Sequence, residues 1–166
     1  MDLNQERVRV SACRSIAAPA AKIFQVLADP VNHPALDASG QVRAARGQAV
    51  LSRVGDTFTM EMHVSALGDY LMLNRIIAFE QDRRIAWEPT PGDAAASRNA
   101  GLPIGTAQGF SWSFQLQPDG DQTIVTQVFD CTGATQKIRD IAADGQNWVP
   151  FMQQTLERLA SMVEQP

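Results

Sequence analysis

The clearest hydrophobic pattern lies near the end of the chain, in residues 147–164. Apolar residues recur there at steps of three and four, which places them on one stripe of an α-helix. Gly145 interrupts what precedes, Asn147 is suited to cap the first turn, and Pro150 is early enough to be tolerated. We predict a long helix with a wide apolar face, made of Val149, Met152, Leu156, Leu159 and Val163 and flanked by Trp148, Phe151 and Met162.

A second pattern, the alternation of apolar and polar residues, predicts strands. The first covers residues 8–16. The others are predicted at 57–64, 70–80, 84–88, 110–116 and 123–130, with weaker candidates at 42–45 and 49–54. Strand 70–80 is apolar on both faces, so its sequence does not decide which face points inward. One of the two faces carries Tyr70, Met72, Asn74 and Ile76.

Short helical segments are predicted between these elements. Pro19 suits the start of one, Asp29-Pro30 ends it, and residues 31–37 add one or two turns. Residues 136–143 form another short helix, with Ile138 and Ile141 on its apolar side. Residues 89–105 are rich in proline, glycine and alanine without periodicity, which predicts a long loop that could serve as a lid.

Together these elements predict one α+β domain over residues 1–166. A curved antiparallel sheet wraps around the long C-terminal helix, and two short helices follow the first strand. This arrangement leaves a cavity between sheet and helix. A chain of 166 residues can bury a full core, and no repeat or linker divides it.

The composition of the chain limits the classes of partner that we expect it to bind. The net charge is -4, the isoelectric point is near 5.1 and no basic run occurs, which argues against nucleic acid. The first ten residues, MDLNQERVRV, show no signal-peptide pattern, and no apolar run is long enough for membrane insertion. We therefore expect a cytoplasmic protein, a monomer or a homodimer, with Cys13 and Cys131 both reduced.

Several segments resemble a known family. Residues 15–40, SIAAPAAKIFQVLADPVNHPALDASG, resemble the first strand and short helices of the helix-grip fold of the START-like, or SRPBCC, superfamily. The segments GDTFTMEMHV (55–64), NRIIAFEQDRRIAWEP (74–89) and TIVTQVFD (123–130) resemble its sheet, in particular in bacterial polyketide cyclase/dehydrase-like members. The resemblance covers nearly the whole chain. It implies the helix-grip fold and a cavity for apolar small molecules, in which some members cyclise polyketides.

The predicted cavity wall combines methionine and aromatic residues with two polar groups. Methionine adapts to varied ligands and aromatic rings offer flat apolar surface, although both also fill ordinary cores. Met162 is counted among the methionines of this wall. The predicted ligand-binding residues are Met60, Met62, Tyr70, Met72, Asn74, Trp87, Phe110, Trp112, Phe114, Trp148, Met152 and Leu156.

Three functions remain open. The first is binding of a small hydrophobic molecule, with aromatic and polyketide-like compounds as candidates. The second is a polyketide cyclase or aromatase, in which Tyr70 and Asn74 hold a carbonyl and Arg75 or His33 assists, although no acid–base pair stands at a persuasive spacing. The third is a protein-interaction module that uses the aromatic hairpin and residues 89–105.

His33 and Asp37 lie four residues apart and could share a helical face, as a polarised base or as two metal ligands. A catalytic zinc site usually needs three protein ligands, and the remaining imidazole, His63, is predicted to face outward. We therefore predict no metal and no other cofactor. We expect His33 to begin a turn and Asp37 to cap one.

Overall fold

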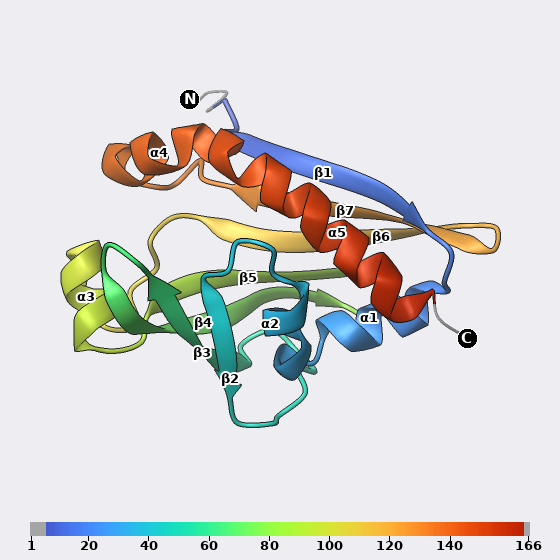
Figure 1. The fold of residues 1–166 in the computed structure, drawn as a ribbon, viewed down its shortest axis with the longest axis horizontal. Helices are drawn as coiled ribbons and strands as arrows, with labels where there is room; N and C mark the ends of the chain where they lie inside the picture. Colours follow the sequence, from blue (N-terminus) through green and yellow to red (C-terminus); the bar gives the residue numbers. More distant parts are fainter. Residues whose placement is uncertain (1–5, 165–166) are drawn as a thin grey trace, which may run out of the picture.

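The computed structural model describes residues 6–164, which form a seven-stranded antiparallel sheet with one long helix packed across a face (Figure 1). The strand order is β1-β7-β6-β5-β4-β3-β2. The strands are β1 (Arg9–Ile16), β2 (Val42–Arg46), β3 (Thr57–Val64), β4 (Gly68–Glu80), β5 (Arg84–Pro91), β6 (Ser111–Asp119) and β7 (Gln122–Asp130). The predicted α+β architecture is confirmed. Residues 1–5, which carry part of the expectation about a signal peptide, lie outside the described residues.

Helices occupy both ends of the sheet. In Figure 1, α1 lies at one end, and α3 and α4 lie at the other. The two short helices expected after the first strand are present. The helical segments are α1 (Ala20–Leu27), η1 (Pro30–Asn32), α2 (His33–Leu36), α3 (Ala94–Ala100), α4 (Gln136–Ala142), η2 (Ala143–Trp148) and α5 (Val149–Val163). No helix in residues 6–164 has the length and apolar character that a membrane span requires.

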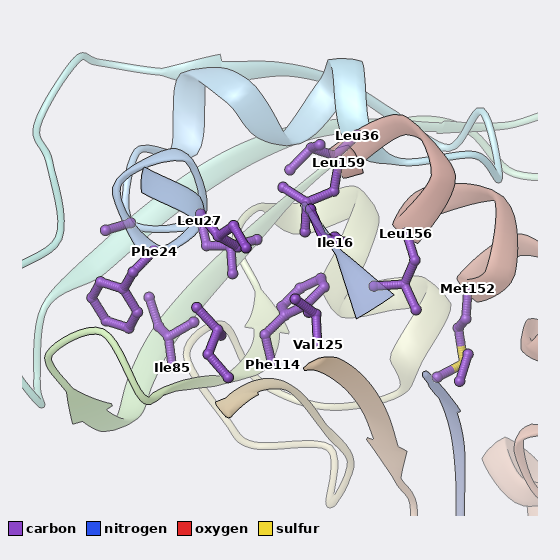
Figure 2. Close-up of a cluster of buried hydrophobic side chains, with 14 of the residues drawn as sticks. Ile16, Phe24, Leu27, Leu36, Ile85, Phe114, Val125, Met152, Leu156 and Leu159 are labelled. Carbon is purple, nitrogen blue, oxygen red and sulfur yellow. The ribbon is translucent and has the colours of Figure 1, made fainter. Parts of the chain in front are cut away.

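The long helix α5 buries most of its predicted apolar stripe. Figure 2 shows Leu156 and Leu159 in one cluster of buried side chains with Ile16 of β1 and Val125 of β7. Phe151 and Met162 flank this stripe as predicted, but each is 38% exposed, so they do not widen the buried face. They project from the flanks of the helix, so the buried face is narrower than expected.

The start of α5 also differs from the prediction. The Asn147 side chain does not cap α5. Its amide donates a hydrogen bond to the Ile141 carbonyl, 2.9 Å away, and so provides a partner for a carbonyl at the end of α4. Between the two helices the backbone is left-handed at three successive residues, Ala143 (φ 50°), Asp144 (φ 52°) and Gly145 (φ 95°). This turn separates α4 from α5, as predicted from the position of Gly145.

The structure settles two predictions about the sheet. The inward face of β4 carries Asn74 and Ile76, both buried, which resolves the ambiguity of that strand. Residues 49–54 are not a strand. The Asp56 carboxylate accepts hydrogen bonds from the Ser52 and Arg53 amides, so this segment folds into a turn instead of pairing.

The long loop predicted at 89–105 is only partly a loop. Strand β5 continues to Pro91 because its pairing with β4 extends that far. Its prolines are tolerated because pairing with β6 ends at Trp87, so no strand on that side needs their amides. Helix α3 follows, capped by Asp93, whose carboxylate accepts from the Ala96 amide at 2.8 Å. Gly101, with φ 68°, ends it. Whether the segment acts as a lid stays a prediction.

The two cysteines are free and offset, as expected from antiparallel pairing of the first and last strands. Cys13 lies opposite Thr126, whereas Cys131 follows the end of β7. Cys13 is exposed and Cys131 is buried.

Candidate functional site

A cavity of about 370 Å³ lies between the inner face of the sheet and the helices α2, α3, α4 and α5. Its volume is in the range of small-molecule sites, about 300–1,000 Å³. On α5, the lining residues are Phe151, Met152 and Thr155, all in the first half of the helix. The second half packs against the solid core.

This division explains which predicted residues meet at the site. Leu156 is fully buried in the core and does not line the cavity. Met162 does not line it either, because it lies in the second half of α5, beyond the turns that reach the cavity. Every other residue predicted to bind ligand does line it, namely Met60, Met62, Tyr70, Met72, Asn74, Trp87, Phe110, Trp112, Phe114, Trp148 and Met152. Their role in binding remains a prediction.

Part of the wall is a group of aromatic rings in contact. His33 is stacked on Trp87, and Phe58 meets both rings edge-on, at centroid distances of 5.3 and 5.8 Å. A second group surrounds Trp112, whose ring lies 4.7 Å from Phe129 and 5.9 Å from Trp148. Both groups present flat apolar surface to the cavity.

His33 is held in one protonation state. Its Nε2 lies 2.8 Å from the Leu27 carbonyl oxygen, so this nitrogen carries the proton and donates, and Nδ1 keeps its lone pair. Burial lowers the pKa of His33, although the Leu27 carbonyl and the carboxylates of Asp29 and Asp37 oppose this effect. The ring is therefore neutral at pH 7.

The His33 and Asp37 pair has the structural role that we predicted. His33 begins α2 and Asp37 ends it, with the Asp37 carboxylate accepting a hydrogen bond from the Ser39 hydroxyl at 2.6 Å. His63 pairs with Asp69 at 2.6 Å near the turn between β3 and β4. Within residues 6–164, no group of three or more His, Cys, Asp or Glu side chains is placed to hold a metal ion.

Of the polar residues suggested for an enzyme, Tyr70, Asn74 and His33 line the cavity and Arg75 does not. Tyr70 and Asn74 line the cavity, and burial raises the pKa of Tyr70, so its hydroxyl stays protonated and can donate. The Asn74 amide makes only long contacts, 3.4 Å to the Phe58 carbonyl and 3.5 Å to that of Met72. Arg75 is not among the lining residues and pairs instead with Glu88 at 3.0 Å, so it is not a helper in the cavity.

Two residues with an unpaired polar atom, Asn99 and Gln127, were missed from the sequence, whereas Trp148 was predicted to line the cavity. In the described part of the chain, four buried side-chain polar atoms lack a hydrogen-bond partner, and three of them belong to cavity-lining residues: Asn99 Nδ2, Gln127 Oε1 and Trp148 Nε1. Native proteins leave few such groups unpaired. Gln127 had a signal, because it occupies an inward position of a strand between Val125 and Phe129. Asn99 had none, because its helix was predicted to be loop.

One end of the cavity opens between exposed apolar residues. Leu67, Ile141 and Phe151 line it and are 53%, 67% and 38% exposed. Ile138 and Ile141, predicted to share the apolar side of this helix, both line the cavity, and Ile141 is largely exposed at its mouth. Helix α4 forms the rim of the opening, so its apolar side meets the cavity mouth and solvent.

Comparisons with known proteins fit this geometry. No family model matches the chain. It is 32% identical over 123 residues to the uncharacterized protein Rv0088 of Mycobacterium tuberculosis, which covers 74% of this chain and 47% of that protein. The chain thus spans about half the length of the curated relatives it matches.

Solved structures extend the likeness to nearly the whole chain. Protein CV1439 from Chromobacterium violaceum has a TM-score of 0.64 and 23% identity, covering 95% of this chain and 98% of that one. A START superfamily protein from Mycobacterium smegmatis has a TM-score of 0.59 and 14% identity, covering 94% and 97%. At these identities the likeness concerns the fold alone. The chain therefore has the START-like, helix-grip fold.

Proposed function

We propose that this chain binds a small hydrophobic molecule in the cavity beneath the first half of α5. The observation that carries the proposal is an open cavity of about 370 Å³ in a chain whose remaining interior is packed with buried apolar side chains. A cavity of this size, apolar with a few polar groups, is typical of small-molecule sites.

The wall favours a flat ligand. The stacked pair of His33 and Trp87 and the cluster around Trp112 offer ring surfaces, and the lining methionines can adjust to the outline of the guest. Aromatic or polyketide-like compounds are therefore the leading class. The charged residues of the lining are Asp37 and Lys137.

Native mass spectrometry of the purified protein, followed by denaturing extraction, tests the proposal. We expect a stoichiometric small molecule on the wild-type chain. Met72→Trp places a larger side chain in the cavity and should abolish retention, whereas Met162→Trp, on the exposed flank of α5, should not. Equal retention by both variants would contradict binding in this cavity.

A second candidate is turnover of the ligand in the same cavity. It is favoured by the protonated hydroxyl of Tyr70 and the neutral imidazole of His33, which are an acid and a base exposed to one apolar space. The Tyr70→Phe, Asn74→Leu double variant would test a cyclase with these groups. Retained turnover of the identified ligand would exclude that mechanism.

A further inference from the structure

Among residues 6–164, Lys137 is the only lysine or arginine that lines the cavity. We propose that its ammonium group binds a carboxylate of the ligand at the cavity mouth, so that the cavity takes aromatic carboxylic acids with the acid outward and the apolar body inward. This inference rests on the proposed binding function and names the class of molecule and its orientation.

Lys137 lies at the mouth of the cavity. It is exposed, and it precedes Ile141 by about one turn of α4, so the two side chains share one face of that helix. Ile141 lines the opening and is 67% exposed. The hydrogen bond from Asn147 to the Ile141 carbonyl joins this end of α4 to the start of α5. Lys137 therefore stands where the cavity meets water, not in the buried interior.

No acidic group of the described chain is paired with Lys137. Asp140, on the same helix, accepts a hydrogen bond from the Gln136 amide at 2.7 Å, and Asp144 pairs with Arg139 at 2.8 Å. Neither of these acids lines the cavity. Within residues 6–164, Lys137 makes no hydrogen bond or ion pair. The three donors of its ammonium group are thus free for water or a ligand.

The other charged lining residue, Asp37, lies farther along the cavity. The amide of Ala38, the next residue, donates to the Thr155 hydroxyl on α5 at 3.3 Å. Thr155 lies about 9 Å along the helix from Val149, the first residue of α5, which is the end joined to α4. A carboxylate is repelled at the Asp37 end and attracted at the Lys137 end, so the lining charges favour one orientation of an acidic ligand.

Aromatic rings lead inward from the mouth. The ring of Phe151, which is 38% exposed, lies 6.4 Å from that of Trp148, and the Trp148 ring lies 5.9 Å from that of Trp112. Trp112 in turn lies 4.7 Å from Phe129, which is only 2% exposed. All four residues line the cavity. A ligand can therefore place its rings among these side chains while its carboxylate stays at the mouth, where ionisation is not penalised by burial.

Equilibrium dialysis at pH 7.5 with three probes of one naphthyl body tests the inference. They are 2-naphthylacetate, which is anionic, 2-naphthylacetamide, which is neutral, and 2-naphthylethylamine, which is cationic. Lys137→Met should weaken the binding of 2-naphthylacetate about threefold, the size typical of an exposed ion pair, and leave that of 2-naphthylacetamide unchanged. Lys137→Glu should weaken the anion by about tenfold and strengthen the binding of the amine.

Three controls separate a local contact from other effects. Lys137→Arg keeps the charge and should retain the affinity for 2-naphthylacetate. Arg43→Met removes the same charge from an exposed residue of β2 that does not line the cavity, and should change none of the three affinities. High salt should reduce the difference between wild type and Lys137→Met, because it screens exposed charges. Both positions are exposed, so we expect these variants to fold normally.

The outcomes that overturn the inference differ from those that overturn the proposed function. If wild-type protein bound the neutral probe but not the anion, or if Lys137→Met and Lys137→Glu left the affinity for the anion unchanged, Lys137 would be a solvated surface residue. An equal loss in Arg43→Met would assign the effect to the net charge of the protein. In these cases the cavity would still bind apolar molecules. If wild-type protein bound none of the three probes, the proposed function would fail as well.

Discussion

The imidazole of His33 lies stacked on the indole of Trp87, with ring centroids 5.3 Å apart and planes inclined by 26°. The hydrogen bond from Nε2 to the Leu27 carbonyl fixes the ring in this position. One histidine thus joins the last residue of α1 to the aromatic wall of the cavity, and it does so as a neutral group.

This arrangement predicts a loss of stability in mild acid. Because burial lowers the folded-state pKa of His33 below its ordinary value of 6.5, the unfolded chain takes up the proton first. The contribution of neutral His33 to the free energy of unfolding is fully present above pH 6.5. It is lost as the pH falls from 6.5 through the folded-state pKa. The slope from one proton is at most about 1.4 kcal/mol per pH unit.

Chemical denaturation between pH 7.5 and 5 measures this effect. His33→Gln should remove this part of the pH dependence. The matched control is His63→Gln, which changes a histidine with 37% side-chain exposure. A pH profile that is identical in wild type and His33→Gln would show that His33 is not the group responsible.

Gln127→Leu should stabilise the ligand-free protein. A buried amide without a partner costs about 1–3 kcal/mol, and leucine suits the apolar neighbours Phe114 and Val125. We expect the free energy of unfolding to rise by about 1 kcal/mol. Gln115→Leu, at an exposed position of β6, is the control and should change it by less than about 0.5 kcal/mol. A clear loss of stability in Gln127→Leu would mean that the amide has a structural partner.

Gly145→Ala should destabilise the fold by about 1–3 kcal/mol. The added methyl group would meet Val10 and Phe129 at less than 3 Å, and alanine is strained at φ 95°. Gly47→Ala controls for strain alone, because Gly47 also has a positive φ (83°) but nothing within 4 Å of its Cβ position. Thermal melting of both variants separates the two effects, and equal losses would show that the close packing at Gly145 is unimportant.

The thiols should differ in reactivity. Cys13 is exposed, whereas Cys131 is buried, and burial together with nearby Asp144 raises the pKa of Cys131. A thiol reagent at pH 8 should modify one cysteine rapidly in folded protein and both after unfolding without reductant. Finding no free thiol in the unfolded, unreduced chain would contradict the prediction that both are reduced.

The sequence predicts the bounds of a helix or strand well where its hydrophobic periodicity agrees with the residues that begin or end the element. Strand 57–64 was placed residue for residue, and α1 begins after Pro19 as expected. Prediction failed where tertiary contacts override local signals. Pro89 and Pro91 are typical loop residues, yet both belong to β5 because β4 still pairs with this part of the strand. Pairing with β6 has already ended there, so the prolines disturb no second neighbour.

The site shows the same limit. Alternation along the strands identified its aromatic and methionine wall, because the inward face of a strand can be read from its sequence. The unpaired state of Gln127 could not be read in this way. It depends on which neighbouring side chains fail to reach it, and those of β1 lie far from it in sequence.

The division of α5 has a consequence for how this protein can change over time. Met152 and Thr155 face the cavity, whereas Leu159 and Val163 are fully buried in the packed core. Substitutions in the first half can therefore alter what the cavity accepts while leaving the core intact, and substitutions in the second half act on folding first. One helix thus carries two sets of positions that can diverge separately, one that shapes the cavity and one that stabilises the scaffold.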